Sequence, residues 1–126
     1  HTRSLCDWSS DVCSSDLVEA LPSAGYRGLS TGMTARPAGI RRIVNAHVDI
    51  MDWTTRAFAG AAASLEALVG ALHDHRTGAA DADEPVGFLT HHLAHDEGAW
   101  AFTAACLQRL KSHRAVRFRH PMKLFA

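Results

Sequence analysis

Residues 85–100 constrain the fold more than any other part of the sequence. A short apolar run is followed there by three histidines and then by two acidic residues. Val86 to Leu89 is too short for a helix and is typical of a parallel strand covered on both faces. The negative charges of Asp96 and Glu97 complement the positive N-terminal end of a helix dipole. We expect this helix to run from about Asp96 to Ser112. A strand with polar side chains at its carboxyl end, followed by a helix, predicts an α/β unit.

A second strand is expected over residues 41–50. Its β-branched residues favour a strand, and alternation places Asn45, His47 and Asp49 on one face. Two shorter strands are predicted at Tyr26–Ser30 and Ala115–Arg119, with a Gly- and Pro-rich loop reaching Gly39 after the first.

An amphipathic helix is predicted from Phe58 to about Arg76, with Thr54 or Thr55 as its N-cap and Gly78 just past its end. The order strand, strand, helix, strand, helix, strand predicts an α/β fold with parallel neighbours. The predicted buried stripes are Phe58, Ala61, Ala62, Leu65, Leu68, Val69 and Leu72 on the first helix, and Ala99, Trp100, Thr103, Ala104, Leu107 and Leu110 on the second.

Charge and hydropathy exclude several classes of partner. Thirteen basic residues balance thirteen acidic ones, and no basic stripe alternates with aromatics, so we expect no nucleic-acid partner. No apolar run approaches the roughly 18 residues of a membrane span, so we expect none. The first residues do not have the pattern of a secretion signal, and the composition indicates no particular compartment.

The first 17 residues differ in character from the rest. They contain Ser-Ser-Asp twice and show neither helical nor strand periodicity. They resemble the translation of a sequencing-adaptor oligonucleotide, so we expect 1–17 to be a disordered, non-native segment and 18–126 to be the natural sequence. Cys6 and Cys13 fall in this segment, and Cys106 is expected to be a small buried hydrophobe on a helix.

Two motifs carry polar side chains at the ends of predicted strands. The first is Asp49-Ile50-Met51-Asp52-Trp53, with two carboxylates beside a large aromatic. Taken alone it also fits turn chemistry at Asp52 and a core tryptophan. Because carboxyl ends of neighbouring parallel strands face one cleft, we expect this motif to lie close to the second one.

The second motif is Thr90-His91-His92-Leu93-Ala94-His95. His91 and His95 would share a helical face and could hold a metal, but the glutamate of a zinc-protease helix is replaced by His92. A histidine at a strand end is more often structural or an acid/base group than a ligand. The motif alone therefore does not predict a metal site.

Together the two motifs resemble the fourth and fifth motifs of the polysaccharide deacetylases, the NodB-like carbohydrate esterases. The resemblance rests on Asp-x-x-Asp-Trp, on Gly-Phe-Leu-Thr-His-His-Leu-Ala-His-Asp-Glu and on the upstream Gly-Tyr-Arg-Gly-Leu-Ser, and covers roughly Gly25 to Phe125. It implies the carboxyl-terminal part of a deformed (β/α) barrel. It also implies a parent enzyme that hydrolyses N-acetyl groups on a carbohydrate substrate with a divalent metal, zinc or similar.

The resemblance assigns roles to five residues. His91, two residues after Leu89, matches the general acid that protonates the leaving amine, with His92 as its rival. Asp49 and Asp52 match the acids that tune this histidine, and Trp53 matches the aromatic wall of the acetyl pocket. A free imidazole has a pKa of about 6.5, which suits proton donation near neutrality. Trp53 and His92 are the expected substrate contacts.

Departures from the family limit what this chain does alone. The family's Asp-Asp pair and His-x-x-x-His set come from motifs that precede the two matched here, and neither occurs between Val18 and Val48, so we expect the fragment itself to hold no metal and to be inactive. Gly87 stands where the family prefers leucine. The alternative is a non-catalytic α/β binding or scaffold domain, in which His91, His92 and His95 bind a metal structurally or pack.

Overall fold

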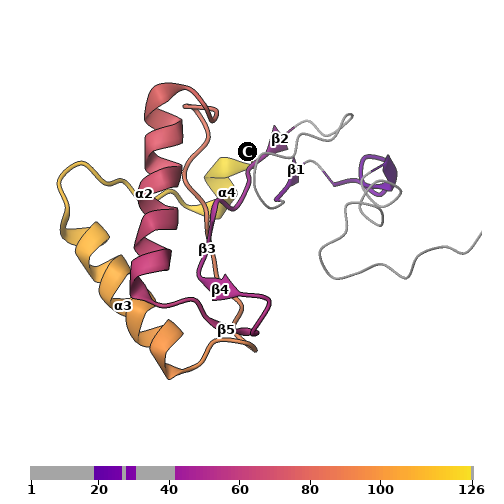
Figure 1. The fold of residues 1–126 in the computed structure, drawn as a ribbon. Helices are drawn as coiled ribbons and strands as arrows, with labels where there is room; N and C mark the ends of the chain where they lie inside the picture. The colour runs from indigo at the N-terminus through magenta and orange to yellow at the C-terminus, as the bar shows by residue number, and fades with distance from the viewer. Residues whose placement is uncertain (1–18, 27, 31–41, 126) are drawn as a thin grey trace, which may run out of the picture.

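The computed structural model describes residues 19–26, 28–30 and 42–125. The predicted non-native segment 1–17 and the loop predicted up to Gly39 lie outside the described residues. The strands are β1 (Gly28–Leu29), β2 (Arg42–Ile43), β3 (Val48–Asp49), β4 (Met51–Asp52), β5 (Ala57–Phe58) and β6 (Phe88–Leu89), and the helices are α2 (Ala61–Thr77), α3 (Glu97–Ser112) and α4 (Pro121–Leu124) (Figure 1).

The described strands form three two-stranded sheets and no closed barrel. β1 pairs with β2 in parallel, β3 pairs with β6 in parallel, and β4 pairs with β5 in antiparallel. The α/β class predicted from the sequence is therefore confirmed as a mixed α/β arrangement with short strands and two main helices. The strand predicted at Ala115–Arg119 is wrong, because residues 115–119 have no ladder partner among the described residues.

The strand predicted over residues 41–50 is interrupted because its pairing partner changes. The Val44 N–H donates to Leu29 O at 3.0 Å, which continues the pairing with β1. The His47 and Val48 N–H groups both donate to Gly87 O, at 2.7 and 3.0 Å, ahead of β6. The chain crosses from one sheet to the other between these contacts, so two short strands replace one long strand.

The predicted start of the first helix is wrong. Phe58 lies in a hairpin, where β4 and β5 are joined by residues 53–56, and Thr54 and Thr55 belong to that turn rather than to a helix cap. Helix α2 begins three residues later, after Gly60, whose φ of 90° turns the chain out of the hairpin. At the other end Gly78 adopts the left-handed conformation expected of a helix C-cap.

Helix α2 buries only part of the predicted stripe: Leu68 is buried as predicted, whereas Ala61 and Ala62 are exposed. Ser64 and Leu68 are buried, whereas three large residues of the predicted stripe are 48–63% exposed: Leu65, Val69 and Leu72. Small side chains let a helix approach a strand closely, and α2 packs on β3 with half-buried Ala67 and Ala71 beside the buried pair. The Ser64 hydroxyl donates to Gly60 O at 2.7 Å, so burial leaves it satisfied.

Helix α3 begins as predicted and lies beside α2 (Figure 1). The Asp96 carboxylate accepts from the Ala99 N–H at 2.8 Å, which caps the helix. Cys106 is buried as expected, and burial raises the pKa of its thiol. No helix in the described ranges combines the length and apolarity needed to cross a membrane. The core joins five buried residues from strands and helices: Val48, Ile50, Leu68, Ala99 and Cys106.

The substitution Ile50→Val should lower the free energy of unfolding by about 1 kcal/mol, because it removes one methylene from a fully buried side chain. The exposed Val69 is the control, and Val69→Ala should change stability by less than about 0.5 kcal/mol. Urea denaturation followed by circular dichroism measures both. Equal effects of the two substitutions would contradict the assigned core.

Candidate functional site

The parallel pair β3–β6 brings the two predicted motifs together. Asp49 is the last residue of β3 and stands opposite Leu89, the last residue of β6. Two residues beyond Leu89 the chain delivers His91, whose Nε2 lies 3.0 Å from Asp49 Oδ2. Asp49 and His91 therefore meet at a common carboxyl end, as the strand pattern predicted.

The Asp49 carboxylate accepts from three groups. Oδ1 accepts from the Met51 N–H at 3.0 Å, and Oδ2 accepts from the Trp53 indole N–H at 2.8 Å. His91 Nε2 is the third partner. Because an ionised carboxylate can only accept, His91 Nε2 carries a proton in this contact, and Nδ1 is left to exchange a proton with a ligand.

Aromatic and histidine rings hold His91 in place. The Trp53 ring meets the His91 ring edge to face, with centroids 4.6 Å apart, while Trp53 remains 51% exposed. His95 Nε2 accepts from the His91 backbone N–H at 3.2 Å, and the His95 ring packs against Trp100 at 4.7 Å. Held at its backbone N–H, at Nε2 and against the Trp53 ring, His91 is preorganised for one orientation.

Two other predicted site residues have different surroundings. The Asp52 carboxylate accepts from the Thr54 N–H at 2.9 Å within the hairpin turn, as the turn interpretation proposed. His92 is exposed. Among the described contacts it is Asp49 that binds His91, so the structure brings together Asp49, His91 and Trp53, while Asp52 ends β4 and its carboxylate binds the hairpin turn.

The pKa of Asp52 should be measurably low. The hydrogen bond from the Thr54 N–H lowers it below the ordinary value of 3.8, against a smaller opposing effect of burial. The folded state then binds this proton more weakly than the unfolded state. The resulting stability is present above pH 3.8 and is lost as the pH falls through the folded pKa. An NMR titration of the Asp52 carboxyl carbon checks this, with the chain in urea as the control. A folded pKa at or above the unfolded one would contradict it.

Sequence reasoning missed a second group of side chains. His47, His75 and Glu84 each offer a ligand atom, and these atoms lie within 4.8 Å of one another. The sequence placed them on a polar strand face, at a helix end and in an acidic loop, and no local spacing links the three. Among the described residues, His47, His75 and Glu84 are the group of three whose side-chain atoms lie close enough to bind one metal ion. This group does not include His91, His92 or His95.

Comparison of the chain with models of protein families, with curated proteins and with solved structures found no match.

Proposed function

We propose that this chain supplies the proton-donating part of an amide hydrolase that removes acetyl groups from N-acetylated sugars, in a domain of the polysaccharide deacetylase type. The observation that carries the proposal is the 3.0 Å contact between His91 Nε2 and Asp49 Oδ2, with the Trp53 ring edge-on at 4.6 Å. An acid, the histidine that it orients and an exposed aromatic match the roles that the sequence motifs assign to them.

In the proposed reaction His91 acts on the leaving nitrogen. Water adds its oxygen to the acetyl carbon and gives its proton to a base, which the family resemblance places in the upstream Asp-Asp motif. Protonated His91 then gives its Nδ1 proton to the amide nitrogen as the C–N bond breaks, while its Nε2–H remains hydrogen-bonded to Asp49. The products are acetate and a free sugar amine, and His91 is left neutral. Asp49 orients the ring and stabilises the imidazolium form, which is how a carboxylate supports a catalytic histidine in hydrolases.

Trp53 is the proposed wall of the substrate site. Its indole N–H is held by Asp49 and half of the residue is exposed. An aromatic ring fixed by its polar edge offers an apolar face, which suits the methyl group of an acetamide or the C–H face of a sugar ring.

The exposed apolar stripe of α2 supports a larger parent domain. Leu65, Val69 and Leu72 lie on one helical face and are all at least 48% exposed. In a (β/α) barrel each helix packs between two neighbours, and α3 covers one side of α2 (Figure 1). We propose that another helix of the parent covers this stripe.

The described residues do not fit the catalytic metal of such an enzyme. The trio with metal-ligand spacing, His47, His75 and Glu84, contains neither Asp49 nor His91. The family's Asp-Asp and His-x-x-x-His ligand motifs, which precede the two matched motifs, are likewise absent from residues 18–48. The proposal therefore assigns proton donation to this chain and routes no step through a metal.

The test uses the reading frame extended upstream of Val18. We expect an upstream Asp-Asp pair and a His-x-x-x-His set. The extended protein, supplied with zinc or cobalt, should release acetate from N-acetylglucosamine oligomers and expose one amine per acetate. Residues 18–126 alone are the control and should release none. An extended protein that folds and carries these motifs but releases no acetate from N-acetylated sugars would refute the proposal.

A further inference from the structure

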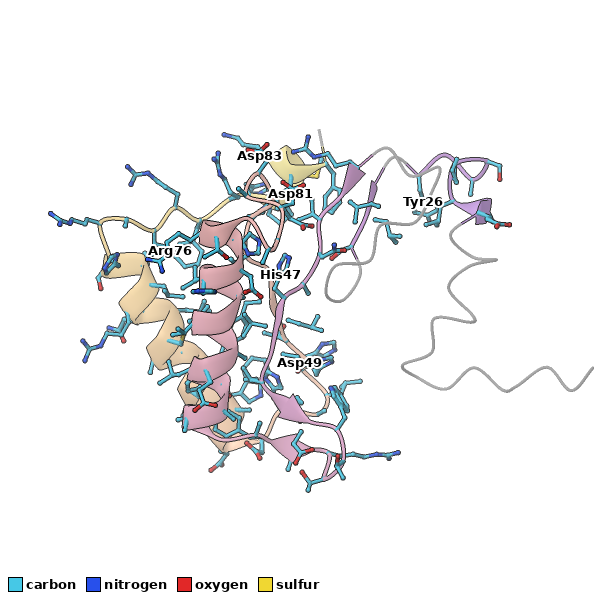
Figure 2. All side chains as sticks on the ribbon, turned by 45° about the horizontal axis from the view of Figure 1, so that its top comes forward. Tyr26, His47, Asp49, Arg76, Asp81 and Asp83 are labelled. Atoms are coloured by element: carbon cyan, nitrogen blue, oxygen red, sulfur yellow. The ribbon has the colours of Figure 1, made fainter. Side chains whose placement is uncertain are left out.

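A buried group of three potential ligands lies between α2 and the segment before β3. His75 is in the last turns of α2, Glu84 is in the loop before Pro85, and His47 directly precedes β3. The side chains of His47 and Glu84 are only 7% and 5% exposed, and the rings of His47 and His75 meet edge to face at 4.6 Å. In Figure 2 His47 lies toward the carboxyl-terminal half of α2, whereas Asp49 lies nearer the hairpin.

His75 has the arrangement of a metal-binding histidine. Its Nδ1 lies 2.7 Å from Ala71 O, and because a carbonyl only accepts, Nδ1 carries the proton. Nε2 then holds a lone pair. This atom is buried and has no hydrogen-bond partner among the described residues. A histidine whose other nitrogen donates to a carbonyl is the usual form of a metal ligand, since the hydrogen bond fixes the tautomer and the ring.

Glu84 adds a buried negative charge beside this lone pair. One carboxylate oxygen accepts from the Asn45 N–H, and the other lies 3.4 Å from His47 Nε2. A buried carboxylate oxygen held in this position can ligate a cation in addition to the partners that it already has.

We propose that His75 Nε2, a Glu84 carboxylate oxygen and His47 Nε2 bind one zinc-class divalent cation. Two histidines and one glutamate form a ligand set that zinc takes in proteins, with a fourth position left for water. A pocket of about 300 Å³ adjoins the group and is lined mainly by small side chains, which leaves room for that water. This inference goes beyond the proposed deacetylase function and does not depend on it.

His47 must change its tautomer to coordinate the cation through Nε2. In the structure its Nδ1 accepts from the Gly87 N–H at 3.0 Å, so Nε2 carries the proton that faces Glu84. Coordination through Nε2 requires the other neutral tautomer, with the proton moved from Nε2 to Nδ1, and this breaks the hydrogen bond from the Gly87 N–H. His47 releases no proton in this change, and the chemical shift of the Gly87 amide reports on it.

The test is a zinc titration of the chelator-treated full chain by calorimetry and NMR. Cys6→Ser and Cys13→Ser form the background, because thiolates also bind zinc. We expect one zinc per chain, a shift of the His75 ring signals and a shift of the Gly87 amide. His75→Gln and Glu84→Gln should each weaken binding at least about tenfold. His73→Ala, on the exposed side of the same helix, should not.

Three results would overturn the proposal. They are no binding tighter than about 1 mM, undiminished affinity in His75→Gln, or zinc-induced shifts at His91, His92 and His95 with none at His75. If His75→Gln fails to fold, the NMR shifts of the background chain decide the question. Acetate release by the extended protein is a separate measurement, so either proposal can fail while the other holds.

Discussion

Under the proposed function, replacing His91 with alanine in the extended protein should lower the rate of acetate release by about 10² to 10⁴-fold. His91 is the imidazole that Asp49 orients at 3.0 Å, and without it no positioned group protonates the departing nitrogen. The loss should appear in kcat more than in KM, because the proton is transferred in the transition state. Steady-state assays of acetate release at several substrate concentrations measure it.

His92→Ala is the matched control for this prediction. His92 is the adjacent histidine and is exposed; the resemblance makes it a substrate contact and not the proton donor, so its removal should act on KM and leave kcat within about threefold of the wild type. Thermal unfolding of both variants tests whether either change acts through stability. If His92→Ala lost as much activity as His91→Ala, or if His91→Ala stayed active, the assigned proton donor would be wrong.

Replacing Gly87 with alanine should lower the free energy of unfolding by about 4 kcal/mol or more. A Cβ on Gly87 would overlap the Asn45 carbonyl oxygen and would lie 2.8 Å from the Ala46 Cα. These are backbone atoms, so neither can turn aside as a flexible side chain would. The clash falls where the His47 and Val48 N–H groups bind Gly87 O, and relieving it opens the β3–β6 pairing.

Gly70→Ala is the control for Gly87→Ala. A Cβ at Gly70 meets nothing within 4 Å, and alanine is the better helix former, so this change should stabilise the chain by about 0.5–1 kcal/mol. Urea denaturation followed by circular dichroism compares the two variants. A Gly87→Ala chain that unfolded at the wild-type urea concentration would contradict the close approach of the two backbones.

The structure also gives a reason for glycine at position 87. The family resemblance favours leucine there, and the sequence alone makes the glycine look like a departure from the motif. In the fold, the residue passes so close to the chain at Asn45 and Ala46 that no side chain fits. Its N–H donates to His47 Nδ1, which ties the two strands together one residue before β6.

The local signals in the sequence predicted the helix ends best. Asp96 caps α3 and Gly78 ends α2, because capping depends on residues within one helical turn. The start of α2 was mispredicted at Phe58 because apolar residues at helical spacing continue back into the hairpin. Part of the buried face of α2 was mispredicted because Leu65 and Val69 are more apolar than Ser64 and Ala67, while the fold selects small side chains for close packing on β3.

The sequence by itself determined that an acid-tryptophan motif and a histidine motif end two short apolar segments, which was enough to predict that the pair Asp49 and Asp52 lies close to His91. Only the tertiary structure decided that Asp49 rather than Asp52 binds His91, and that His47, His75 and Glu84 gather elsewhere. The physical reason is the separation along the chain of the residues that interact. Caps, turns and strand alternation depend on neighbouring residues, whereas a contact between distant segments depends on pairing and packing that no local pattern records.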